Sequence, residues 1–201
     1  MLKITIIKRS QKSIRLRIKN HQNVILSVPK HYNNAHCEQI IEQNRKWIES
    51  KILLLQTKER ELSQLTQTQK ILYFGQWLDI AKFANPKEIL ANDLKDLICK
   101  YASELANKMS LRYEDIKLTN AKSYFGLCTN KNLLKFSLML CFAPKNCIEY
   151  VVIHELSHIT HKNHSKNFWN LVEEFCPDYK CRRKMLRENA EIYKRMLARI
   201  F

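Results

Sequence analysis

The segment YVVIHELSHIT, residues 150–160, constrains the chain most, because its pattern fits only one kind of secondary structure. Branched and aliphatic residues such as Val151 and Leu156 recur at helical spacing, which predicts a packed helix. His154 and His158 are four residues apart, so on that helix they lie on one face, one turn above the other. The sequence therefore requires a helix that carries two neighbouring imidazoles.

Two imidazoles at this spacing suit a metal ion. Together they can bind one Zn²⁺ with bonds of about 2.1 Å each. Glu155 follows the first histidine, where its carboxylate can act on a metal-activated water molecule without being a ligand itself. This is the H-E-x-x-H arrangement, in which the glutamate serves as general base. We predict His154 and His158 as zinc ligands and Glu155 as the catalytic residue.

A hydrolytic zinc ion needs a third protein ligand and one open position. His164 is the main candidate, because its separation of six residues from His158 lets the chain leave the helix and turn back. Asn163 tolerates left-handed backbone angles and is predicted to make this reversal. Three further residues stay open as alternatives for the third ligand: His161, Glu173 and Glu174.

The remaining pattern predicts an α+β protein. Residues 2–28 alternate in polarity, which predicts an antiparallel β meander with one basic face. Helical periodicity follows from residue 34 to about 69, and then a hairpin that turns at Gly75. The predicted elements after this are a helix opening at Asn85-Pro86, extended segments over 116–142, the helix after Pro144 and a C-terminal amphipathic helix. We expect an N-terminal region 1–84 and a domain 85–201, or one continuous domain 1–201.

The charge of the chain restricts its possible binding partners, and its cysteine content restricts its cellular compartment. The chain has 35 Lys plus Arg against 19 Asp plus Glu, a net charge of +16 that suits nucleic acid or an acidic substrate. These cations are spread along the chain without a block, so a nucleic-acid partner is one possibility and not a requirement. Seven scattered cysteines read as reduced thiols, and neither a signal peptide nor a membrane span is recognisable. We expect a cytoplasmic, soluble protein.

Residues 150–180, YVVIHELSHITHKNHSKNFWNLVEEFCPDYK, resemble the YgjP-like metallopeptidase-domain family, relatives of the SprT-like and WLM zinc proteins. The shared parts are a tyrosine-led zinc helix, an Asn-His-Ser turn, a Phe-Trp pair and a Pro-Asp-Tyr stop. Weaker similarities lie in the basic strands ending at Val28-Pro29, in Lys46-Trp47-Ile48 and in Gly75. The resemblance implies a zincin-like C-terminal part with a small antiparallel sheet and an active-site helix. It also implies His154, His158 and His164 as zinc ligands and Glu155 as the base.

One motif departs from that family. Its members usually carry Trp-Gly-Ser-Cys before the last strands, whereas this chain reads FGLC at residues 125–128. The serine of the family motif is thus replaced by Leu127. Cys128 is interpreted as a structural thiol and not as a ligand.

The predicted function is a zinc metallopeptidase that acts on a peptide or protein. Its substrate is expected to pair with an exposed edge strand at residues 133–140. Two alternatives are a metal-dependent phosphohydrolase of nucleoside triphosphates and a non-catalytic, nucleic-acid-associated zinc protein. Asp178 is interpreted as either a partner of a ligand imidazole or a helix cap. Candidates for a second electrophilic group are Tyr179, Tyr193, Arg182 and Arg183.

Overall fold

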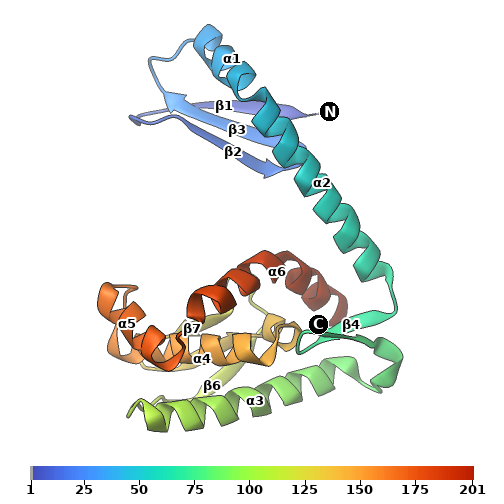
Figure 1. Ribbon diagram of the computed structural model, residues 1–201, viewed down its shortest axis with the longest axis vertical. Coiled ribbons are helices and arrows are strands. Elements are labelled where there is room, and N and C mark those ends of the chain that lie inside the picture. Colours follow the sequence, from blue (N-terminus) through green and yellow to red (C-terminus); the bar gives the residue numbers. More distant parts are fainter. Residues whose placement is uncertain (1) are drawn as a thin grey trace. The chain divides into compact units, whose positions relative to one another are not determined.

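The computed structural model describes residues 2–201, and their side chains except those of residues 58, 61, 62 and 64–67. It is a mixed α+β structure, as predicted (Figure 1). The chain forms two compact units, Met1–Gln67 and Thr68–Phe201. We predicted either two domains with a boundary at 84/85 or one continuous domain. The choice depends on which parts of the chain fold independently, so both stay predictions.

The first unit contains a sheet of β1 (Lys3–Arg9), β2 (Arg15–Asn20) and β3 (Asn23–Pro29) in the order β1-β3-β2. β2 is antiparallel to β3, but β1 is parallel to it. The predicted antiparallel meander is therefore wrong for β1. Alternating polarity shows which side chains share a face and not which strands are neighbours. The central place belongs to β3, whose Val24, Leu26 and Val28 are fully buried.

Two helices follow the sheet where the sequence predicted one. They are α1 (Asn34–Gln43), which the Asn33 side chain caps, and α2 (Arg45–Gln67). Asn44 interrupts them, because its side chain donates a hydrogen bond to the Ile40 carbonyl at 2.8 Å and its backbone leaves the helical range. Residues of α1, among them Cys37 and Ile40, cover the face of the sheet that carries Leu26 and Val28.

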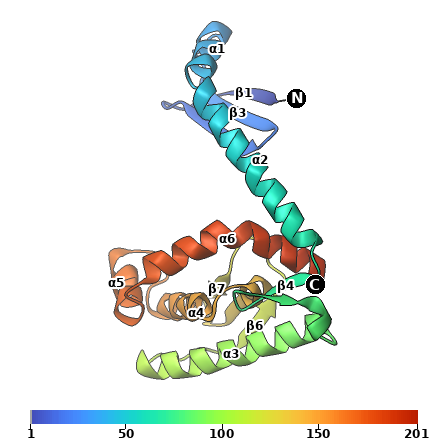
Figure 2. The ribbon, with the colours of Figure 1, turned by 45° about the vertical axis from the view of Figure 1, so that its right-hand side comes forward.

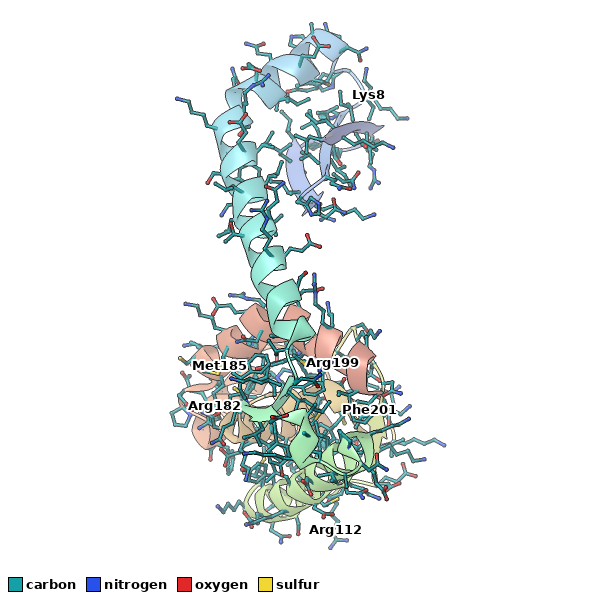
Figure 3. The ribbon with its side chains drawn as sticks, turned by 90° about the vertical axis from the view of Figure 1, so that its right-hand side faces the viewer. Lys8, Arg112, Arg182, Met185, Arg199 and Phe201 are labelled. Atoms are coloured by element: carbon teal, nitrogen blue, oxygen red, sulfur yellow. The ribbon has the colours of Figure 1, made fainter. Side chains whose placement is uncertain are left out.

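The second unit opens with the predicted hairpin, β4 (Lys70–Tyr73) and β5 (Gln76–Asp79), followed by a short helix η1 (Ile80–Lys82). Phe74 and Gly75 both have positive φ, as a two-residue hairpin turn requires. The Phe74 N–H donates to the Cys141 carbonyl at 2.8 Å, and Arg199 donates to carbonyls at 68 and 70 (Figure 3). The hairpin is thus bound to the core of the second unit.

Helix α3 (Pro86–Lys108) begins at the predicted Asn85 cap and is followed by β6 (Ile116–Thr119), β7 (Gly126–Cys128) and β8 (Leu134–Ser137). The strand order is β6-β8-β7, with β6 parallel and β7 antiparallel to β8. The predicted small antiparallel sheet is therefore mixed. Residues 133–140 are also not the exposed edge that we expected, because β8 is central and residues 138–142 form a buried 3-10 helix, η2.

The last three helices are α4 (Lys145–Thr160), α5 (Lys166–Phe175) and α6 (Tyr179–Ile200). α4 runs between α3 and α6 in both views, with α5 at its end (Figures 1 and 2). Nine of its 16 residues are buried, so it is the central helix of the unit. Within the described residues, no helix has the length and apolarity needed to cross a membrane.

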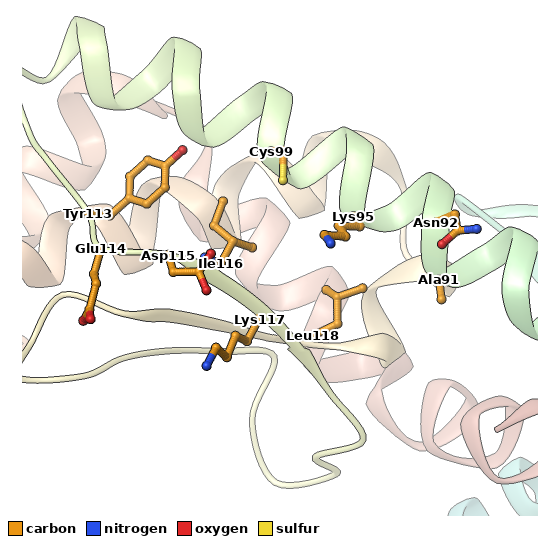
Figure 4. Close-up of a pocket in the computed structure, with 10 residues that line it drawn as sticks. All are labelled: Ala91, Asn92, Lys95, Cys99, Tyr113, Glu114, Asp115, Ile116, Lys117 and Leu118. Atoms are coloured by element: carbon orange, nitrogen blue, oxygen red, sulfur yellow. The ribbon is translucent and has the colours of Figure 1, made fainter.

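A separate open pocket of about 690 Å³ lies between α3 and β6 (Figure 4). Its lining mixes cations and carboxylates, including Lys95, Glu114 and Lys117, and contains none of the predicted site residues.

Candidate metal centre

The burial of α4 explains how its two histidines are held in place. Apolar side chains such as Val152 and Leu156 are fully buried, which fixes the rotation of the helix. His154 and His158 are then only partly buried and share one side, with ring centroids 4.9 Å apart. The predicted helix and the predicted pairing of the imidazoles are both present.

His164 joins these two histidines from the loop after α4. One ring nitrogen from each of the three lies within 4.8 Å of the other two. The Nε2 atoms of His154 and His164 are 3.1 Å apart, and His158 contacts the His161 carbonyl through Nδ1 at 3.0 Å, which leaves its Nε2 available. Ligands of a tetrahedral zinc ion, with bonds of about 2.0–2.1 Å, are separated by about 3.3 Å. The cluster therefore fits one metal ion.

The alternatives for the third ligand lie elsewhere. The imidazole of His161 is outside the cluster, and its backbone carbonyl instead contacts the ring of His158. Glu173 is exposed and approaches Lys180 at 3.5 Å, and Glu174 is also outside the cluster. The structure brings together the three histidines that the sequence favoured.

The loop turns by a different means from the one we predicted. Asn163 is not among the residues with positive φ, so no left-handed residue makes the reversal. The helix instead ends at Thr160, and the next residue, His161, has an extended backbone. Ser165 then caps α5 by accepting a hydrogen bond from the Phe168 N–H, directly after His164.

Phe168 and Trp169 support the three imidazoles. Phe168 is fully buried, and its ring centroid lies 4.4–4.9 Å from those of all three histidines. Trp169 is half-buried and stacks on His164 at 5.6 Å and on Tyr179 at 5.1 Å. Phe168 thus forms the apolar floor beneath the three imidazoles, whereas Trp169 also lines an open cleft.

Glu155 points from the same helix toward β7. Only 4% of its surface is exposed, and its carboxylate accepts a hydrogen bond from the Cys128 backbone N–H. A Cβ atom at Gly126 would lie 2.5 Å from Glu155 Oε1, so the strand leaves room for this carboxylate only because residue 126 is glycine. Burial raises the pKa of Glu155 to about 8, and the Cys128 N–H opposes that shift.

The histidines are held in their neutral, metal-binding form. Burial, together with the nearby His158, His164 and Arg183, lowers the pKa of His154 to about 3. Its buried Nδ1 has no hydrogen-bond partner among the described residues, so a second ring proton there would be unsatisfied. Burial also lowers the pKa values of His158 and His164. Protons therefore compete weakly with a metal ion for these nitrogens.

A cleft of about 660 Å³ opens beside His154, His164 and Glu155. Of the four residues predicted to offer a second electrophilic group, only Arg183 lines this cleft, where its guanidinium lies 4.9 Å from the Trp169 ring centroid. Arg187, one turn further along α6, lines it as well.

The other candidates stabilise the fold. Arg182 pairs with Glu149 at 2.7 Å and with Asp178 at 2.9 Å, so Asp178 contacts this arginine and not a ligand imidazole. Tyr179 stacks on Trp169, and the Tyr193 ring lies 6.3 Å from that of Phe125.

Sequence reasoning missed two residues that line this cleft. Gly126 falls within the segment predicted to be extended, and a glycine at such a place can mark a strand that another group approaches closely. No sequence pattern identifies Arg187. It lies four residues after Arg183, and this spacing matters only once α6 is known to face the cleft. Leu127 lies on the opposite face of β7 from Gly126, since strand side chains alternate. The Leu127 side chain, which replaces the serine of the family motif, therefore points away from Glu155.

Comparison with known protein families identifies the family to which the sequence is similar. The family model described as "YgjP-like, metallopeptidase domain" matches residues 12–90 and 81–189. No curated protein and no solved structure matches the chain.

Proposed function

This chain belongs to the YgjP-like metallopeptidase-domain family, and on that premise we propose that it is a zinc-dependent peptidase acting on a peptide or protein. We assign His154, His158 and His164 as zinc ligands and Glu155 as the general base. The observation that carries the proposal is the convergence of three imidazole nitrogens beside one buried carboxylate, at an open cleft that His154, His164 and Glu155 line. The seven free cysteines favour a reducing compartment, so we place the protein in the cytoplasm.

The choice of zinc rests on the donor set. Three neutral imidazoles without a carboxylate ligand suit Zn²⁺ and leave one position open, as in catalytic zinc sites. When bound, the ion would supply Lewis-acid activation of water and of the scissile carbonyl.

Glu155 moves the proton in this scheme. Its pKa of about 8 in the metal-free chain shows how strongly burial disfavours its charge, and a dication nearby would favour the ionised form. The carboxylate then accepts a proton from the attacking water and passes it to the leaving amine. The Cys128 N–H holds the carboxylate in one orientation during both transfers.

The edge of β7 is the place for an extended substrate. β7 pairs with β8 on one side only, and it is the strand nearest to Glu155 through Gly126. A peptide that adds to this edge would lie along the cleft, held by main-chain hydrogen bonds. We therefore propose that the substrate pairs with the edge of β7 and not with residues 133–140, as the sequence had suggested.

We assign to Arg183 the role of stabilising the negative charge that develops on the substrate. It is the one cation of the four predicted helpers that lines the cleft, and the stacking contact with Trp169 limits its freedom.

A second candidate function is hydrolysis of nucleoside triphosphates. Arg183 and Arg187 place two guanidinium groups in the cleft, and such groups also suit phosphate oxygens. The same metal and the same base would serve this reaction.

Metal content and hydrolysis together test these assignments. Protein purified without a tag or added metal is measured by elemental mass spectrometry as wild type, His164→Ala and His161→Ala. We expect about one zinc ion per chain, lost in His164→Ala. His161→Ala should keep it, because the carbonyl at 161, and not the imidazole, contacts His158. Peptide pools and nucleoside triphosphates are then offered to wild type and Glu155→Gln.

The outcomes separate the candidates. Peptide hydrolysis that falls by about 10²–10⁴-fold in Glu155→Gln, with zinc retained, supports the peptidase. The same loss for triphosphates alone would favour the second candidate. Every activity unchanged in Glu155→Gln would leave a structural zinc protein, and a chain that takes up no zinc on titration would end the hydrolase proposal.

A further inference from the structure

Positive charge is concentrated at the start of the chain. Residues 3–30 contain eight Lys and Arg, and the first carboxylate of the chain is Glu38. The other 27 cations share the rest of the sequence with all 19 Asp and Glu. Half of the net charge of +16 therefore belongs to the three-stranded sheet of the first unit and its turns.

The register of that sheet gathers four of these cations on one face. Arg17 is paired with Ile25 and Arg15 with Ser27, while across β3 the partners are Lys3 with Asn23 and Arg9 with Pro29. All of these side chains point to the face opposite Val24, Leu26 and Val28. We call the face that carries Lys3, Arg9, Arg15 and Arg17 the basic face. All four are exposed.

The helices of the first unit leave this face uncovered. The cluster that includes Cys37 and Ile40 packs on Leu26 and Val28, on the other side of the sheet. Lys8, labelled in Figure 3, also belongs to that other side and donates to Asn34 Oδ1 at 3.3 Å. The basic face is thus separate from the core that holds the sheet to its helices.

Throughout the described part of the chain, no ion pair involves Lys3, Arg9, Arg15 or Arg17. Like charges this close repel one another, a cost that a bound polyanion would relieve.

The spacing and composition of the basic face indicate which kind of polyanion would bind to it. Alternate residues of a strand are about 6.6 Å apart, so Arg15 and Arg17 present their charges in a regular row. The side chains between the cations are small or aliphatic, such as Thr5, Ile25 and Ser27, and include no aromatic ring on which a base could stack. Such a surface contacts repeated phosphates and not bases.

We propose that the basic face of the β1-β3-β2 sheet is a docking surface for the phosphate backbone of nucleic acid, independent of base sequence. A duplex binds at least as well as a single strand of the same length, because its charge density is higher and no stacking platform favours the single strand. The proposal does not depend on the metal centre or on the proposed peptidase activity.

Binding of the full-length chain to labelled DNA tests the proposal. Fluorescence anisotropy is recorded with a short duplex and a single strand at salt concentrations from about 50 to about 200 mM. The test variant is Arg9→Gln/Arg15→Gln/Arg17→Gln. The matched control, Lys87→Gln/Lys100→Gln/Lys108→Gln, removes the same charge from exposed positions of α3. Vesicles containing phosphatidylserine serve as a second anionic surface.

We expect the test variant to bind DNA at least about tenfold more weakly, with a salt slope smaller by about 2 to 3, since each lost phosphate contact removes about 0.9. The control should stay within about threefold of wild type. Equal weakening in both variants would reduce the effect to net charge and overturn the proposal, as would binding to the vesicles without binding to DNA. Unchanged zinc content and circular dichroism show that the folded protein is being compared.

Discussion

The two three-stranded sheets of this protein have the same topology and different surroundings. In β1-β3-β2 and in β6-β8-β7, the third strand lies in the middle, parallel to the first and antiparallel to the second. The first sheet has helices on one face and a row of cations on the other. The second has α4 beside β7, so that a backbone N–H of this strand reaches Glu155.

The comparison shows that topology alone does not give a sheet its role. In the edge strand that is antiparallel to the central one, β2 has Leu16 opposite Leu26, whereas β7 has Gly126 opposite Phe136. Leu16 packs into a small core, and Gly126 makes room for a carboxylate. The side chains of the edge strand, and not the topology, therefore give the two sheets their different surroundings.

The largest effect is expected from adding a side chain to β7 at Gly126. In Gly126→Ala, the added Cβ would displace the Glu155 carboxylate, because the two would be 2.5 Å apart. Hydrolysis should fall by about 10²–10⁴-fold at unchanged zinc content, the amount a general base contributes. Steady-state kinetics and elemental analysis measure both. Leu127→Ala, on the opposite face, is the control, and full activity of Gly126→Ala would contradict our account of this strand.

A smaller difference is expected between the cores of the two sheets. Leu134 of β8 and Leu26 of β3 are both fully buried on the central strand. Removing either to alanine should cost about 2–5 kcal/mol of unfolding free energy. Leu134→Ala should lie near the upper end and Leu26→Ala near the lower, because the edge-strand neighbours of Leu26 include Ile6, which is 38% exposed.

Urea denaturation followed by tryptophan fluorescence measures both costs, since Trp47 lies in the first unit and Trp169 in the second. Equal costs, or a loss larger for Leu26→Ala, would contradict the view that the first sheet has the weaker core.

The smallest expected effect comes from pH and concerns the metal-free second unit. The pKa of His154 is lowered to about 3 in the folded chain, against about 6.5 when unfolded. As the pH falls below 6.5, the unfolded chain takes up a proton that the folded chain does not, so stability decreases. Between pH 6.5 and 5 the loss from His154 is about 2 kcal/mol. Glu155 acts in the opposite direction, because its pKa is raised to about 8 and the folded chain gains stability when this group takes up a proton. The His154 contribution is therefore measured as a difference, by thermal unfolding in the presence of a chelator, and wild type should lose about 2 kcal/mol more than His154→Gln between pH 6.5 and 5.

Much of the site could be predicted from the sequence, because its groups are close along the chain. The spacing of His154, Glu155 and His158 has a meaning as soon as a helix is assumed, and that assumption needs only local periodicity. His164 follows within one short loop. The turn itself was predicted incorrectly at Asn163, because a loop is shaped by the contacts of its ends, here Ser165 and Phe168, more than by its own residues.

The errors in the fold concern long-range pairing. The parallel alignment of β1 with β3, and the central place of β8, depend on which strands exclude water together. The same holds for Gly126, Arg183 and Arg187, which matter because of what approaches them from other elements.

The sequence by itself therefore determined the histidine pattern of the candidate metal site, the α+β class, most of the element types and the excess of positive charge. Periodicity, capping and composition are local properties, and they can be read from neighbouring residues. Only the tertiary structure decided which strand borders Glu155, which arginine lines the cleft, and that four cations share one sheet face. Those facts follow from strand order and helix packing, which join residues far apart in the chain to bury the core.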